Sequence, residues 1–179
     1  MRPRLTVTSM TMTFVLMAVA ASVFGGEEML STSAVMPAFA LTAHDGSLVS
    51  SAELLGTPYL LYYYPKADTP GCTQEACALR DSWSDVEKAG LAVFGVSYDT
   101  PEDNAAFAAK YHLPFLLLSD SKKELAEQVG AARALLPVPK RISYLVGRDG
   151  RVLKAYPSVR PAEHAQEVLA DFRQLDGSR

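Results

Sequence analysis

The sequence predicts an α/β protein built on one mixed central sheet flanked by helices. Short apolar runs of strand length alternate with segments whose apolar residues recur at helical spacing, which is typical of parallel strands joined by crossover helices. Two pairs of apolar runs are each separated by an Asp-Gly dipeptide, which adds antiparallel hairpins near both ends of the domain. The 179 residues, 49% of them hydrophobic, are enough for one domain with its own core.

The first half of the domain is expected to place a buried strand before a long helix. The elements are a hairpin over 39–49, a strand over 59–64, a helix over 72–88 and a strand over 91–98. Asp45-Gly46 turns the hairpin. The unbroken apolar and aromatic run Tyr59–Tyr64 is typical of a strand buried on both faces, and Pro65 ends it. The helix has apolar residues every three or four positions, and Gly90 ends it.

The second half repeats this alternation and closes with a hairpin and a helix. The elements are a helix over 101–111, a strand over 115–118, a helix over 122–129, hairpin strands over 142–146 and 152–156, and a helix over 161–172. Thr100 can cap the first of these helices, and Pro101 suits its first turn. Asp149-Gly150 turns the hairpin.

Residues 1–25 are interpreted as a secretory signal peptide or a retained N-terminal anchor, residues 26–35 as a linker, and residues 36–179 as the domain. Arg2 and Arg4 precede an apolar run over 10–24, which is the arrangement of an export signal. This run is shorter than the roughly 18 residues of a confident membrane span. We therefore expect export, to the periplasm, with membrane contact only if the segment is not cleaved.

The composition argues against two classes of protein. Lys and Arg number 17 and Asp and Glu number 20, so the net charge is −3 and no strongly basic surface for nucleic acid is expected. Two cysteines are too few for a disulfide-stapled scaffold, and the chain is long enough to fold without staples.

Cys72 is the residue best placed for chemistry. It lies in the first turn of the expected 72–88 helix, just after the C-terminal end of a buried strand, which is the edge where open α/β sheets bind ligands. Unpaired backbone N–H groups and the helix dipole favour the thiolate there, and the thiolate is the nucleophilic form of cysteine. The alternative is that Cys72 is an inert, small apolar side chain.

Cys77 follows Cys72 by five residues. In an ideal helix this spacing separates the two Cα atoms by roughly 8–9 Å, whereas a disulfide requires less than about 7 Å. Two alternatives remain open. Either the bond never forms, or the first turns of the helix unwind to form it.

The stretch from Tyr64 to Cys77 resembles a known family. Pro65, Thr69 and Cys72 match the P-x-x-x-T-x-x-C signature of peroxiredoxins. The fuller sequence Tyr-Pro-Lys-Ala-Asp-Thr-Pro-Gly-Cys-Thr, with Cys77 five residues later, resembles the bacterioferritin comigratory protein / peroxiredoxin Q branch. The likeness extends from about residue 36 to 172 and implies a thioredoxin-like fold. It also implies a thiol peroxidase for hydrogen peroxide and organic hydroperoxides, without metal or organic cofactor.

The resemblance implies an atypical 2-Cys mechanism. Cys72 would be the peroxidatic cysteine, which attacks a peroxide oxygen and becomes a sulfenic acid. Cys77 would be the resolving cysteine, which gives an intramolecular disulfide that a thioredoxin-like dithiol reduces. A monomer is the expected state.

Four further residues receive roles from the resemblance. Thr69 would orient the peroxide, and Pro65 would shield the sulfur from water. Arg141 would hold the thiolate and polarise the O–O bond. Glu75 would orient Arg141 through a charge-assisted hydrogen bond, although a solvated acid in the first helical turn is an equal alternative. The placement of Arg141 relies on alignment across the segment 131–139, which is shorter here than in many relatives.

Two other functions are alternatives to the peroxidase. A metallochaperone on the same fold would use both cysteines and a histidine, but a spacing of five places the thiols about 140° apart around a helix. A thiol–disulfide exchange protein usually carries C-x-x-C, which is absent. His44, His112 and His164 are isolated in the sequence and are expected to be surface or cap residues.

Overall fold

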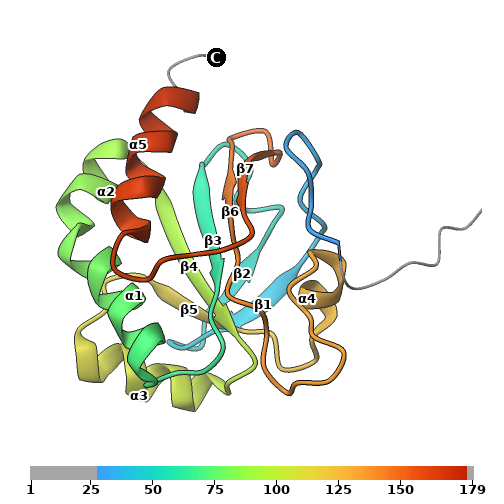
Figure 1. The fold of residues 1–179 in the computed structure, drawn as a ribbon, viewed down its shortest axis with the longest axis vertical. Helices are drawn as coiled ribbons and strands as arrows, with labels where there is room; N and C mark the ends of the chain where they lie inside the picture. The colour runs from blue at the N-terminus through green and yellow to red at the C-terminus, as the bar shows by residue number, and fades with distance from the viewer. Residues whose placement is uncertain (1–27, 177–179) are drawn as a thin grey trace, which may run out of the picture.

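A computed structural model describes residues 28–176, which form a single seven-stranded sheet with helices packed against it (Figure 1). The strand order is β2-β1-β5-β4-β3-β6-β7. The strands are β1 (Ala40–Ala43), β2 (Leu48–Ser50), β3 (Tyr59–Tyr63), β4 (Ala92–Ser97), β5 (Leu116–Ser119), β6 (Ser143–Val146) and β7 (Val152–Tyr156). The predicted mixed α/β sheet is confirmed.

Strand β3 lies inside the sheet, between β4 and β6. It runs parallel to β4 and antiparallel to β6, and all five of its residues are buried. This double-sided burial is the reason its sequence is a continuous apolar and aromatic run rather than an alternating one. The antiparallel pairing also brings the chain that enters β6 to the edge where β3 ends.

The helices are α1 (Pro70–Asp81), α2 (Trp83–Ala89), α3 (Pro101–Tyr111), α4 (Glu124–Gln128) and α5 (His164–Asp176). Alternate residues of β3 enter two separate cores. Leu60 packs into the core that includes residues of α1, α2, α3 and α5, whereas Leu61 packs into the core that includes residues of α4. Helices therefore cover both faces, as the sequence predicts.

The prediction of one continuous helix over 72–88 is wrong in two respects. The helix begins at Pro70, whose missing N–H suits the first turn, and it is broken at Ser82 into α1 and α2. The backbone N–H of Ser82 bonds to the carbonyls of Ala78 and Arg80, which closes α1. The break redirects the chain so that the Trp83 ring packs 5.8 Å from that of Phe115. Tertiary packing thus overrides a continuous helical periodicity.

The helix ends follow local sequence rules. The Thr100 hydroxyl accepts a hydrogen bond from the Asp103 N–H at 3.1 Å, as the predicted cap requires. Gly90 ends α2 with φ 68°, and His112 ends α3 with φ 53°. Helix α5 begins at His164, three residues later than predicted, because residues 161–163 form a turn.

The predicted export signal, residues 1–25, lies outside the described residues. Most of the segment predicted as a linker is described, and it lies against the domain. The Leu30 N–H donates to the Tyr144 hydroxyl at 3.1 Å, and Val35 forms an isolated bridge with Arg151. Gly130, with φ 71°, passes so close to Glu28 that a Cβ atom would lie 2.4 Å from its carbonyl oxygen. Within residues 28–176, every helix is too short or too polar to cross a membrane.

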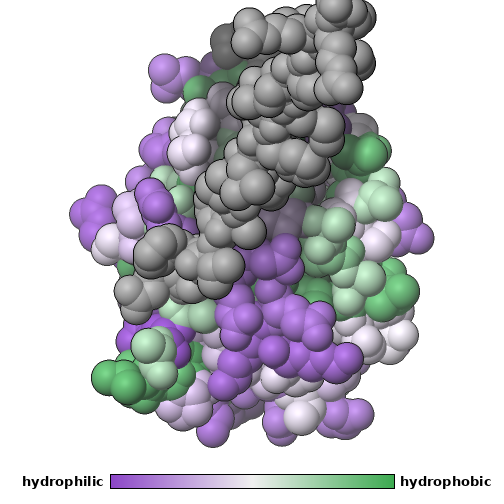
Figure 2. Space-filling view, turned by 90° about the vertical axis from the view of Figure 1, so that its right-hand side faces the viewer, coloured by the Kyte–Doolittle hydropathy of each residue, from purple (hydrophilic) through white to green (hydrophobic). Residues whose placement is uncertain are grey.

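The surface is mixed rather than uniformly apolar or charged. On the described part of the face in Figure 2, hydrophilic side chains gather in the lower centre and hydrophobic groups lie separately at the sides. The large apolar side chains exposed on the described part of the chain are Val35, Leu48, Leu55, Leu135 and Leu136.

Candidate active site

The candidate site lies where β3 ends and α1 begins. Residues 64–69 carry the chain from the sheet edge to the helix, and Cys72 is the third residue of α1. Its side chain is 1% exposed. The first helical turn contributes N–H groups that lack helical partners and the positive end of the dipole. Helix α1 carries no acidic residue in that turn to oppose this effect.

Arg141 reaches Cys72 from the chain that leads into β6, the strand next to β3. It lies two residues before β6, and the antiparallel pairing of β6 with β3 places it beside the start of α1. Its Nη2 atom donates to the Cys72 Sγ atom at 3.2 Å. A guanidinium at this distance stabilises negative charge on the sulfur. The positions are 69 residues apart in the sequence.

Glu75 holds the opposite edge of the same guanidinium. Its side chain is fully buried, and its Oε2 atom accepts a hydrogen bond from Arg141 Nη1. Its Oε1 atom has no hydrogen-bond partner among the described residues. Burial raises the pKa of Glu75 to about 7, although the charge of Arg141 opposes the shift. The alternative of a solvated acid is excluded by this burial.

The charges around Arg141 keep it protonated. Burial alone would lower its pKa, but the charges of Glu75 and Cys72 outweigh burial and raise it. The Arg141 side chain remains 20% exposed, so the cation keeps partial contact with solvent while its guanidinium contacts the buried groups Cys72 and Glu75.

The remaining predicted site residues lie on the same stretch of chain. Thr69 is the N-cap residue of α1, and its hydroxyl donates to the Lys66 carbonyl at 2.9 Å instead of capping the helix. Pro65 is half-buried just after β3. Cys77 is half-buried, and both cysteines are free within an intact α1. Their catalytic roles stay predictions.

Two residues beside the site, Gly71 and Tyr62, receive no role in the chemistry from the sequence. A Cβ atom on Gly71 would lie 3.2 Å from Arg141 Nη2, so a glycine here allows the guanidinium to approach the helix. Tyr62, on β3, has a buried hydroxyl with no hydrogen-bond partner among the described residues, and its high pKa reflects burial first and then the charges of nearby groups that include Glu75 and Cys72. Gly71 stands inside the recognised motif and could have been found there.

The structure confirms the sequence-based expectation for His112 and contradicts it for His164. His112 is a helix cap, as expected. His164 is wrong as a surface or cap residue: it is fully buried, and its Nε2 atom lies 2.9 Å from the Ser143 hydroxyl. Burial lowers its pKa to about 4. Within the described chain, no three His, Cys, Asp or Glu side chains are grouped to hold a metal ion.

We expect Glu75→Gln to change how stability depends on pH. A carboxyl whose pKa is raised from 4.5 to about 7 binds more protons in the folded state, so its contribution to stability is present below pH 4.5 and is lost as pH rises through 7. The variant should therefore gain stability relative to the wild type between pH 5 and pH 8, by up to roughly 3 kcal/mol. Urea unfolding at both pH values measures the difference.

The pH dependence of stability must be compared between the wild type and Glu75→Gln, because His164 also titrates. Its lowered pKa acts in the opposite direction, because a buried neutral histidine loses stability as pH falls from 6.5 through about 4. Subtracting the two profiles cancels this contribution, which both proteins share. Parallel profiles for the wild type and Glu75→Gln would show that Glu75 does not titrate in this range.

Comparison with known proteins relates this chain to one family and to several named peroxiredoxins. Residues 33–155 match the model of the AhpC/TSA family. The chain is 40% identical over 142 residues to a chloroplastic peroxiredoxin Q of Gentiana triflora, covering 78% of this chain and 65% of that one. It is 38% identical over 146 residues to the peroxiredoxin Bcp of Escherichia coli, covering 78% of this chain and 94% of that one. The crystal structure of peroxidoxin BcpB from Mycobacterium tuberculosis superposes with a TM-score of 0.76 at 31% identity, covering 83% and 99% of the two chains.

Proposed function

This chain belongs to the AhpC/TSA family, in its peroxiredoxin Q / bacterioferritin comigratory protein branch, and is a thiol peroxidase with a thioredoxin-like fold; we propose that Cys72 is its peroxidatic cysteine. The observation that carries the proposal is the contact of 3.2 Å between Arg141 Nη2 and the Cys72 Sγ atom, at the first turn of α1. Cys77 is half-buried, and the arginine that it interacts with is Arg80 of the same helix, not Arg141.

The first step is attack of the Cys72 thiolate on one oxygen of the peroxide. An S–O bond forms, the O–O bond breaks, and the leaving oxygen takes a proton to depart as water or an alcohol. The sulfur is oxidised to a sulfenic acid by two electrons, and the peroxide is reduced by the same two. Arg141 stabilises the thiolate and the charge that develops on the leaving oxygen, because its guanidinium contacts the sulfur.

Three neighbours support this step. Thr69 can rotate its hydroxyl from the Lys66 carbonyl toward a bound peroxide and orient it. Pro65 limits water at the sulfur from its half-buried position after β3. Glu75 is a positioning residue that holds Arg141 through the buried hydrogen bond to Nη1.

Cys77 completes the cycle as the resolving cysteine. Its thiolate attacks the Cys72 sulfur, an S–S bond forms, the S–O bond breaks, and hydroxide leaves as water. A thioredoxin-like dithiol then reduces the disulfide. Mass spectrometry after one equivalent of hydrogen peroxide tests this route. A Cys72–Cys77 disulfide is the expected product, and a chain that consumes no peroxide, or that reacts only at Cys77, would contradict it.

Organic hydroperoxides are proposed as substrates beside hydrogen peroxide. An open hollow of about 630 Å³ adjoins Arg141 between the segment after α4 and the segment after β7. Its lining includes Leu135 and Leu136, which are 94% and 48% exposed. Exposed leucines beside the catalytic cation offer an apolar surface to the organic part of a hydroperoxide while its O–O group reaches the sulfur.

We expect Leu135→Ser to lower kcat/KM for cumene hydroperoxide by about fivefold, which is the effect of losing partial burial of one leucine side chain. The rate with hydrogen peroxide should be unchanged, because that substrate has no apolar part. Stopped-flow kinetics with both peroxides measures the ratio. Leu48→Ser is the matched control, since Leu48 is 63% exposed on β2 and does not line the hollow. An equal loss with both peroxides would remove Leu135 from substrate recognition.

The setting of the enzyme is proposed from residues 1–25. The basic start and short apolar run support export to the periplasm, followed by action as a monomer with an exported dithiol as reductant. Cell fractionation followed by intact mass measurement tests this placement. A full-length chain in the cytoplasm would contradict it.

A further inference from the structure

Disulfide formation requires α1 to change shape. Cys72 and Cys77 both lie inside the intact helix Pro70–Asp81. Five residues of helix hold their Cα atoms roughly 8–9 Å apart, beyond the reach of a disulfide of about 7 Å. The turns that carry Cys72 must therefore open before a Cys72–Cys77 disulfide can form. Contacts that hold this stretch of chain in place affect how often it opens.

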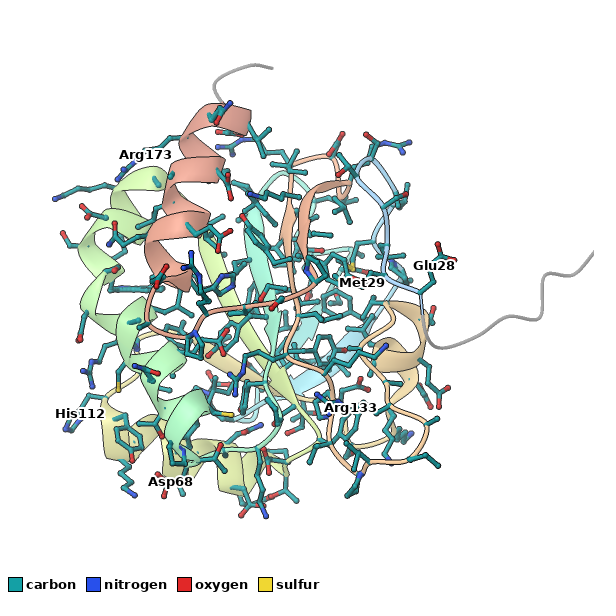
Figure 3. All side chains as sticks on the ribbon, in the orientation of Figure 1. Glu28, Met29, Asp68, His112, Arg133 and Arg173 are labelled. Carbon is teal, nitrogen blue, oxygen red and sulfur yellow. The ribbon has the colours of Figure 1, made fainter. Side chains whose placement is uncertain are left out.

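The last turn of α3 holds the chain just before Cys72. The Lys110 Nζ atom lies 2.7 and 2.9 Å from the two carboxylate oxygens of Asp68, and the Tyr111 hydroxyl donates to Asp68 at 2.7 Å. These bonds lower the pKa of Asp68. Asp68 has φ 56°, so its backbone is fixed in the left-handed region. Figure 3 shows Asp68 on the same lower side of the molecule as His112, the residue that follows α3.

The same turn also holds the chain just after Cys77. The Arg80 Nη1 atom donates to the Tyr111 carbonyl oxygen at 2.8 Å. Arg80 lies one helical turn beyond Cys77, and its pKa is raised first by its hydrogen bond to Asp81 and also by Cys77. Tyr111 therefore contacts both sides of the segment 68–80 that contains both cysteines. We call Lys110 and Tyr111 the α3 clamp.

We propose that the α3 clamp consists of positioning residues that set how fast α1 opens after Cys72 is oxidised, and thereby whether Cys72 forms a disulfide or is overoxidised. The inference rests on the proposed function of Cys72 and Cys77. When Asp68 moves with the opening turns, its bonds to Lys110 and Tyr111 must break. While they remain intact, the sulfenic acid stays in the closed site beside Arg141, out of reach of Cys77.

Two reactions compete for the sulfenic acid. In resolution, Cys77 attacks the Cys72 sulfur, the S–O bond breaks, and water leaves after proton transfer. In overoxidation, the sulfenate sulfur attacks a second peroxide, a new S–O bond forms, the O–O bond breaks, and water or an alcohol leaves, which gives a sulfinic acid. The second reaction takes place in the closed site and needs only more peroxide. Slower opening therefore favours overoxidation.

Lys110→Met and Tyr111→Phe test the clamp. Each is expected to raise the rate of disulfide formation about two- to fivefold, the range expected for losing one exposed charged or hydrogen-bonded contact. The rate of the first oxidation should be unchanged, because neither residue contacts Cys72. Stopped-flow fluorescence of Trp83, the single tryptophan, separates the two steps. Mass spectrometry at high peroxide should show a correspondingly smaller sulfinic acid fraction.

Lys88→Met is the matched control. Lys88 is an exposed lysine on α2 whose contact with Asp85 is 4.0 Å, and its loss should leave both steps unchanged. Salt gives a test on the unmodified protein. Raising NaCl from about 0.05 to 0.5 M screens the exposed Lys110–Asp68 pair and should speed resolution in the wild type but not in Lys110→Met.

The possible outcomes distinguish failure of the clamp proposal from failure of the proposed roles of Cys72 and Cys77. Unchanged resolution rates in both variants, with no differential effect of salt, would overturn the clamp while leaving the peroxidase intact. Absence of any Cys72–Cys77 disulfide in the wild type would instead overturn the resolving role of Cys77. A slower first oxidation in Lys110→Met would show that the clamp acts on the site itself rather than on opening, which also contradicts the proposal.

Discussion

Cys72→Ser is expected to abolish peroxide turnover. A serine hydroxyl in the same place stays protonated at neutral pH, and oxygen cannot take the place of sulfur in accepting the transferred oxygen atom. The helix start and Arg141 would remain, but neither can react with peroxide by itself. Peroxide consumption with a thioredoxin-like reductant, monitored in stopped flow, should fall to the uncatalysed rate. Turnover at the wild-type rate would end the assignment of Cys72.

Cys77→Ser is the matched variant for that experiment. It keeps one cysteine and the whole site around Cys72, so one equivalent of peroxide should still be consumed at the wild-type rate. The reaction should then stop at the sulfenic acid, which dimedone traps as a mass adduct, unless an added thiol resolves it. Continued turnover without any added thiol would show that Cys77 is not the resolving residue.

The placement of Cys72 at a helix start beside the sheet edge could be predicted from sequence because its surroundings are local. The end of β3, the turn after it and the first turn of α1 are contiguous in the sequence. The residues of this one stretch therefore determine where the Cys72 side chain lies relative to the sheet edge. Arg141 is different. Only the antiparallel pairing of β3 with β6 brings it to Cys72, and residue patterns alone do not distinguish it from a surface charge beside Lys140. The family resemblance supplied that long-range information.

Features that depend on packing between distant elements could not be predicted. The break at Ser82 has no local signal of its own, because the apolar spacing continues through it. Glu75 is buried because other elements pack over this face of α1. From the sequence alone, the position of Glu75 is equally suited to an acid exposed to solvent. The bonds of the α3 clamp to Asp68 join residues more than 40 positions apart through exposed polar side chains, and hydrophobic periodicity does not predict contacts of this kind.

Arg141→Met is expected to lower the second-order rate of Cys72 oxidation by about 10²- to 10³-fold, the usual effect of removing one group that stabilises transition-state charge. The guanidinium is the described cation in contact with Cys72 Sγ, and methionine fills similar space without charge. Arg141→Lys should be intermediate, because an ammonium keeps the charge but cannot bridge the sulfur and Glu75 through two edges of one planar group. Stopped-flow oxidation of the reduced proteins measures all three rates.

The single variant also leaves Glu75 buried without its cation, which removes the influence that lowers the pKa of this carboxyl and destabilises the fold. Arg141→Met with Glu75→Gln removes both charges and separates the two effects. If Arg141 acts on the reaction itself, the double variant recovers stability in urea unfolding but remains slow toward peroxide. Recovery of the rate together with stability would mean that Arg141 serves the fold. In that case the chemistry at Cys72 would depend on the start of α1 and on Thr69, without the guanidinium.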